Sequence, residues 1–86
     1  MSKVTIADVC NTFHVEPSCV TQVRTKQLFI VDTPTKRVLV SYKTIVGRFI
    51  DSMWFLTKRK YSSTTSRQLS SFARDTPYDV RWSETI

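Results

Sequence analysis

The segment over residues 26–58 constrains the fold most, because four short runs of strand type follow one another with turn signals between them. The runs, rich in β-branched and aromatic residues, are 27–32, 37–42, 44–50 and 53–58. Pro34 presets φ for a turn, and Asp32 can accept a hydrogen bond from the turn backbone. A second turn signal lies at 51–52, and Gly47 marks a bulge or bend. Such short connections predict an antiparallel meander.

Apolar residues near the start recur at helical spacing, at i, i+3, i+4 and i+7. They are Ile6, Val9, Cys10 and Phe13. Thr5 can cap this helix, and Asp8 three residues later approaches a capping box. Residues 14–25 are open to two interpretations. Pro17 could begin a second helix, or residues 19–25 could be extended.

The hydroxyl run 62–66 suits a helix N-cap, and an amphipathic helix is predicted after it. Its apolar face, which can cover the meander, holds Thr65, Leu69, Phe72 and Ala73. Its wet face holds Arg67, Ser70, Ser71 and Arg74. Pro77 ends the helix, and the alternation of Tyr78, Val80 and Trp82 with polar residues predicts a last half-buried strand.

Together these segments predict one small α+β domain over residues 1–86, within the usual size range of single domains. Residues 1–25 form an N-terminal helical segment. Residues 26–86 form an antiparallel β-meander covered by one amphipathic helix and followed by a short C-terminal strand. A chain of this length buries only about 60 to 65% of its unfolded surface, so modest stability is expected.

The charge balance favours an anionic partner, because 13 Lys and Arg stand against 7 Asp and Glu, giving +6 at pH 7. No apolar run approaches the ~18 residues that cross a bilayer, and the start lacks the apolar core of a signal peptide. Two cysteines are too few for a disulfide framework. We therefore expect a soluble protein of a reducing cytoplasm, without a membrane partner.

Signatures of catalysis are sparse, which predicts a non-enzymatic protein without a cofactor. The chain has one histidine, no glycine-rich phosphate loop and no carboxylate pair beside a nucleophile. Cys10, His14 and Cys19 lack the fourth ligand and the close cysteine pair of zinc modules. Two buried cysteines beside a turn histidine are the favoured interpretation, so no metal is expected.

The strongest local chemistry lies where the last strand of the meander passes into the later helix. Lys58, Arg59 and Lys60 precede the hydroxyl run, and Arg67 lies in the first helical turn. Cations, hydroxyls and free backbone N–H groups at one helix end favour an anion such as a phosphate. The alternative is a solvated basic loop followed by an ordinary Ser/Thr cap.

Aromatic residues interleave with cations along the same part of the chain and would suit base stacking. The aromatic residues are Tyr42, Trp54 and Tyr61, and the cations are Lys43, Arg48 and Lys58. At strand spacing, however, a place in the core is the favoured interpretation for aromatic side chains.

Val-Thr-Ile-Ala-Asp-Val-Cys at 4–10, with the segment 15–24, resembles the helix-turn-helix of the lactose-repressor family. That family typically begins Val-Thr-Ile-x-Asp-Val-Ala and continues Gly-Val-Ser-x-x-Thr-Val-Ser-x-Val. The resemblance implies a recognition helix that starts with Ser18, Cys19, Thr21 and Gln22 and faces the DNA major groove. His14 stands where the family has its turn glycine, and histidine adopts the left-handed conformation less readily.

The C-terminal two-thirds resembles small uncharacterised accessory proteins of bacteriophages. Ser-Tyr-Lys-Thr-Ile-Val at 41–46, Trp-x-Leu-Thr at 54–57 and Lys-Tyr-Ser-Ser-Thr-Thr-Ser-Arg-Gln at 60–68 carry it, followed by Phe72. The resemblance implies a strand-strand-helix module in the cytoplasm of a host cell. It also implies a context, because such proteins often bind and redirect a host component.

Two functions follow as hypotheses. The favoured one is nucleic-acid binding, with DNA preferred, through Lys58, Arg59, Lys60, Ser62, Arg67 and Arg74. The alternative is a protein-binding inhibitor of a host polymerase, nuclease or defence enzyme. Its contact surface would be the meander edge or exposed Trp54 and Phe55.

Overall fold

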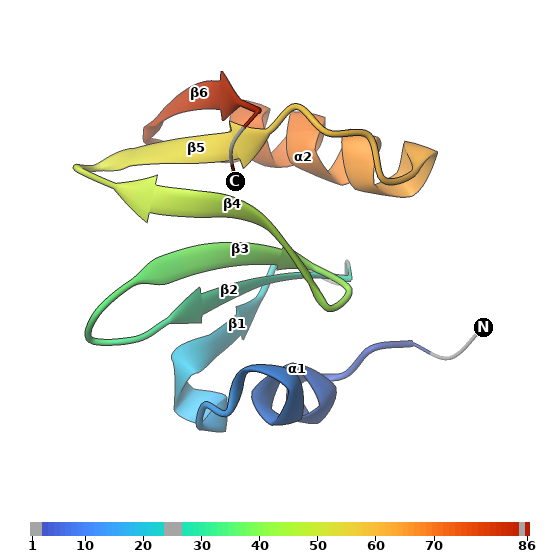
Figure 1. The fold of residues 1–86 in the computed structure, drawn as a ribbon, viewed down its shortest axis with the longest axis vertical. Helices are drawn as coiled ribbons and strands as arrows, with labels where there is room; N and C mark the ends of the chain where they lie inside the picture. Colours follow the sequence, from blue (N-terminus) through green and yellow to red (C-terminus); the bar gives the residue numbers. More distant parts are fainter. Residues whose placement is uncertain (1–2, 24–26, 85) are drawn as a thin grey trace.

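The protein is a six-stranded mixed sheet with one helix on each face (Figure 1). The computed structural model describes residues 3–23, 27–84 and 86. The elements are α1 (Ile6–Phe13), a 3-10 turn (Pro17–Cys19), β1 (Val20–Gln22), β2 (Leu28–Asp32), β3 (Arg37–Ser41), β4 (Thr44–Ile50), β5 (Met53–Thr57), α2 (Ser63–Asp75) and β6 (Asp79–Ser83). The strands lie side by side in sequence order. The predicted α+β class is confirmed, and so are the four meander strands.

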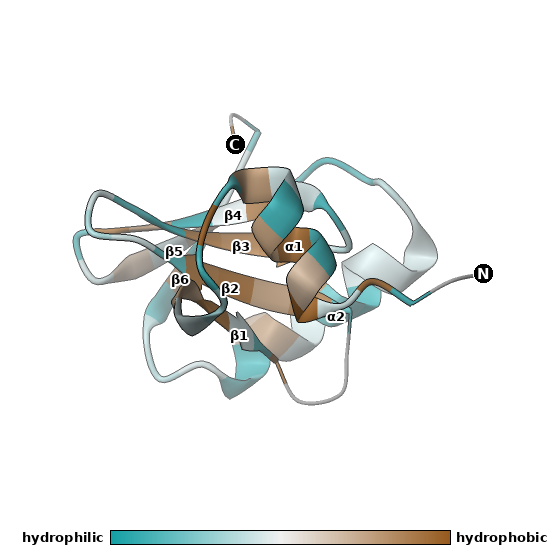
Figure 2. Cartoon of the chain, turned by 90° about the horizontal axis from the view of Figure 1, so that it is seen from below, coloured by the Kyte–Doolittle hydropathy of each residue, from teal (hydrophilic) through white to brown (hydrophobic). Residues whose placement is uncertain are grey.

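The first helix begins and ends as its sequence predicts. The Asp8 amide donates to Oγ1 of Thr5 at 3.2 Å, and the Thr5 amide donates to the Asp8 carboxylate at 2.9 Å, which completes the capping box. His14 ends the helix in the left-handed conformation, at φ 55° and ψ 48°. Val9 and Cys10 of α1 are buried against one face of the sheet. Figure 2 shows the hydrophobic strands β2 and β3 behind α1.

The recognition helix that the repressor resemblance implied is not formed. Pro17 begins only a single 3-10 turn, and Val20–Gln22 pairs with β2 as an antiparallel strand, with Val20 opposite Val31. Pairing with β2 satisfies the backbone of this segment and buries Val20 in the core under α1. Thr21 therefore lies on a strand, and residues 24–25 of the predicted segment fall outside the described residues.

The second helix covers the opposite face of the sheet, behind β5 in Figure 1. Leu69 and Phe72 are buried there, as predicted, and they pack in a cluster with side chains of β2 to β5. The cluster contains Leu28, Leu39, Val46, Trp54 and Leu56. Gln68 is also buried, although it was not among the residues of the predicted apolar face.

Gly47 lies beside a bulge, as its position in the strand pattern indicated. The β3–β4 register shifts there, so that Leu39 faces Gly47 whereas Val40 faces Ile45. A Cβ atom on Gly47 would lie 2.7 Å from Cδ2 of Leu56. Because Gly47 has no side chain, Leu39 and Leu56 of the neighbouring strands can pack over its Cα on the face that α2 covers.

The last strand is parallel to β5, because α2 carries the chain back along the sheet before β6 begins. The strand forms as predicted, and its aromatic residue Trp82 is 44% exposed, while Tyr78, just before the strand, is 45% exposed. β6 lies at the sheet edge, and only Val80 reaches the core under α2.

Trp54 is 2% exposed and packs edge-on against Phe72, with 5.1 Å between ring centroids. The favoured interpretation of Trp54 as a core residue is therefore confirmed, and the exposed Trp54 of the inhibitor hypothesis is wrong. Its register opposite Phe49 places it on the face that α2 covers. In the described part of the chain, no helix is long and apolar enough to cross a membrane.

Candidate nucleic-acid interface

The connection from β5 to α2, together with Arg67, gathers most of the predicted site residues, and we call it the basic junction (Lys58, Arg59, Lys60, Ser62 and Arg67). Its first residues are fixed by backbone hydrogen bonds. The Lys58 amide donates to the Ser83 carbonyl of β6 at 2.8 Å. The Arg59 amide donates to Oγ1 of Thr57 at 3.0 Å. The two cations thus start from an anchored backbone.

Ser62 is the N-cap of α2, as the hydroxyl run predicted. Its Oγ accepts a hydrogen bond from the Thr65 amide at 3.1 Å, and its carbonyl accepts the Ser66 amide at 3.0 Å. The amides of the first turn that precede Thr65 have no place in the intrahelical hydrogen-bond pattern. They leave partial positive charge at this end of the helix.

A chain of buried hydroxyls holds the start of α2 on the sheet. The Ser41 hydroxyl donates to Oε1 of Gln68 at 2.8 Å, so its 3.1 Å contact with Thr65 is one in which Thr65 donates. Ser62 donates in turn to Oγ1 of Thr65 at 3.1 Å. Each hydroxyl has one hydrogen to donate, so the donors run in one direction from Ser62 to Gln68. The helix N-terminus therefore has a fixed position relative to β3.

A depression of about 480 Å³ lies at this end of α2. Its lining consists of Lys60, Tyr61, Ser62, Ser63, Ser66 and Arg67. Two cations line the hollow together with the hydroxyls of Ser63 and Ser66, whereas the Ser62 hydroxyl donates to Thr65, and no carboxylate belongs to its described lining. The Arg59 guanidinium lies over the Tyr61 ring, 5.5 Å from the centroid. The lining carries two positive charges and no described negative one, so the hollow suits an anion.

The structure brings together some predicted site residues and separates others. Lys60, Ser62 and Arg67 line the hollow, and Arg59 adjoins it through Tyr61. Arg74 does not belong to it, because it lies in the last turn of α2, about 10 Å along the helix axis from Arg67. The sequence grouped it with the others by charge, whereas the helix length sets it apart.

One exposed aromatic residue near the junction had no signal in the sequence. Trp82 is 44% exposed, and it precedes the residue whose carbonyl pairs with the Lys58 amide. Period-two alternation placed it in a half-buried strand without deciding its own exposure. Its exposure follows from the edge position of β6, which only the assembled sheet defines.

The cysteines are both free thiols, with Cys10 buried and Cys19 partly buried. Within residues 3–23, 27–84 and 86, no group of three or more His, Cys, Asp or Glu side chains could hold a metal ion. His14 serves as the C-cap of α1.

Comparison with known families places the chain in a family whose function is unknown. Residues 15–84 match the model of a family of unknown function (DUF8033), and the chain belongs to that family. No curated protein and no solved structure matches it.

Proposed function

We propose that this chain is a non-enzymatic nucleic-acid-binding protein that holds backbone phosphates at the basic junction, with DNA as the favoured ligand. The depression lined by Lys60, Arg67 and serine hydroxyls carries the proposal. Arginine binds phosphate in a bidentate manner, lysine adds a point charge, and hydroxyls and helix-terminal amides donate further hydrogen bonds.

Binding of this kind reads the phosphate backbone and carries no sequence information by itself. It releases counterions from the nucleic acid, so the logarithm of the binding constant falls linearly with the logarithm of the salt concentration. Exposed Tyr61 at the hollow and Trp82 at the neighbouring strand edge would add stacking with unpaired bases. Single strands are therefore expected to bind at least as tightly as duplexes of equal length.

The decisive experiment measures fluorescence anisotropy of labelled single-stranded and duplex DNA, and of RNA, across a range of salt concentrations. The test variant carries Lys60→Glu and Arg67→Glu, and both positions are exposed. The matched control carries Arg48→Glu and Arg81→Glu, which change net charge equally at exposed positions of β4 and β6.

The test variant should lose about tenfold or more in affinity and show a shallower salt slope, because phosphate contacts are removed. The control should lose much less. Equal losses in the two variants would mean that net charge alone attracts the nucleic acid. Unchanged affinity of the test variant at low salt would refute the site.

A further inference from the structure

The sheet face that α1 covers is only half covered. One cross-strand row on this face runs through all six strands: Val20, Val31, Val38, Arg48, Phe55 and Arg81. Its three valines are buried with α1, whereas both arginines are exposed. α1 has eight residues and is about 12 Å long, but six strands span about 24 Å. The helix lies by β1 and β2 in Figure 1, and no helix of the described residues covers β4 to β6 on this side.

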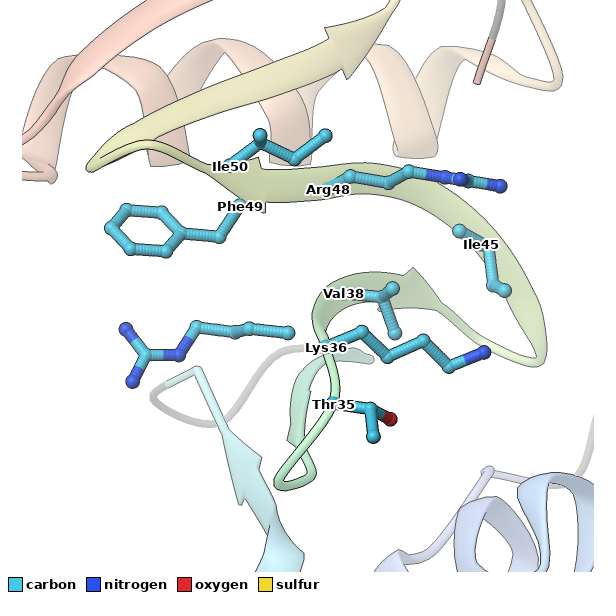
Figure 3. A pocket seen from close by; sticks show the side chains of 8 residues that line it. Thr35, Lys36, Val38, Ile45, Arg48, Phe49 and Ile50 are labelled. Atoms are coloured by element: carbon cyan, nitrogen blue, oxygen red, sulfur yellow. The ribbon is translucent and has the colours of Figure 1, made fainter.

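Two hollows lie on the open part, and both include Arg48 and Ile50. The first, of about 350 Å³, adds Val38, Ile45 and Lys36. Figure 3 shows the Lys36 and Arg48 side chains extending in one direction, with Val38 and Ile45 between them. The second, of about 290 Å³, adds Phe55 of β5, with Ser83 and Ile86 from the C-terminal end of the chain.

The charges around these hollows are mostly positive. No described carboxylate forms an ion pair with Lys36, Arg48 or Arg81, whereas Arg37, at the end of the first hollow, pairs with Asp32 at 2.9 Å. Asp79 lies in β6 two residues before Arg81, and it is the carboxylate that this strand presents on the open face. The surface therefore has an apolar floor and a predominantly cationic rim.

The geometry points to a second binding surface, a docking site for an acidic amphipathic segment of a partner protein. Apolar side chains of the segment would enter the two hollows, and carboxylates between them would meet Lys36, Arg48 and Arg81. Ile50, which lines both hollows, is 49% exposed, and covering it removes apolar area from water. Charge complementarity would set the orientation and speed of association.

The same features disfavour two other occupants. A second copy of this chain would bring Arg48 and Arg81 against like charges. A nucleic acid would find a floor that is mainly aliphatic, and its two aromatic residues, Phe49 and Phe55, are only partly exposed. The site is separate from the basic junction, so it does not depend on the proposed nucleic-acid binding.

The experiment titrates isotope-labelled protein with two synthetic peptides and follows backbone amide shifts by NMR. One peptide alternates leucine with glutamate, and the other places leucines at helical spacing in a glutamate background. Versions with lysine in place of glutamate are the charge controls, and a single-stranded DNA oligonucleotide is a third ligand. Arg48→Glu with Arg81→Glu is the test variant, and Lys60→Glu with Arg67→Glu is the matched control.

We expect saturable binding of at least one acidic peptide, with shifts at Arg48, Phe55 and Arg81. The test variant should lose about tenfold or more in affinity, and the matched control should retain it. Thermal unfolding of each variant shows that the fold is intact. Failure of both acidic peptides to bind, equal binding of lysine peptides, or shifts confined to other residues would overturn the proposal. Oligonucleotide shifts at these three residues would assign the face to nucleic acid instead.

Discussion

The Ser41 hydroxyl at the end of β3 donates a 2.8 Å hydrogen bond to Oε1 of Gln68 in α2, and both side chains are buried. This bond joins two residues that are 27 positions apart. It fixes the position of α2 along β3 and, through Thr65, the position of the helix N-terminus. The candidate anion site at the surface thus depends on a polar contact inside the molecule.

Ser41→Ala should destabilise the protein by about 1–3 kcal/mol, because the Thr65 hydroxyl and the Gln68 carbonyl oxygen lose their buried partner. Chemical denaturation measures this loss as a lower denaturation midpoint, and the m-value should stay the same as in wild type. Ser70→Ala on the exposed side of α2 is the matched control and should have little effect. Equal stability of the two variants would mean that water replaces the missing hydroxyl.

Phe72→Ala should cost about 3–5 kcal/mol, since the ring is buried and packs edge-on against Trp54. Thermal unfolding beside wild type measures it. Tyr61→Ala, which removes a 44% exposed ring, should cost much less. DNA affinity of Phe72→Ala should also fall, because a loosened α2 no longer holds its first turn in place. A melting temperature close to that of wild type would contradict the packing.

Gly47→Ala should destabilise the sheet by about 1–3 kcal/mol, because the new methyl group overpacks a filled region. The Cβ would meet Leu56 at 2.7 Å, the Leu39 Cβ at 3.2 Å and the Phe55 carbonyl at 3.3 Å. Denaturant unfolding measures the change. A stability equal to that of wild type would show that Leu56 moves aside without cost.

The capping box of α1 predicts an acid-dependent contribution to stability. The Thr5 amide, and then its hydroxyl, donate to Asp8 and hold its pKa below the ordinary value of 3.8. Because the folded-state pKa is lowered, this contribution is complete above pH 3.8 and is lost as pH falls through the lower folded value.

Melting temperatures of wild type and Asp8→Asn should therefore differ at neutral pH and converge in strong acid. Asp51→Asn, in an exposed turn, is the control and should show a smaller difference at neutral pH. A gap between wild type and Asp8→Asn that is the same at both pH values would refute the role of the carboxylate.

The sequence alone determined the local elements of this protein, because their signals lie within a few residues. Thr5 and Asp8 specify the start of α1, Pro34 a turn, and Ser62 the start of α2. The same reasoning found the basic junction, since its cations and hydroxyls are contiguous in the chain. Helix periodicity also predicted that Leu69 and Phe72 hold α2 to the sheet.

Only the tertiary structure decided what long-range pairing controls. Residues 20–22 became a strand because β2 offers them partners and a core, and Trp54 is buried whereas Trp82 is exposed because one strand is central and the other lies at the edge. The Arg48, Phe55 and Arg81 row exists only once three strands align. Local spacing fixes which side chains share a face, but the length and placement of the covering helices fix which faces meet water.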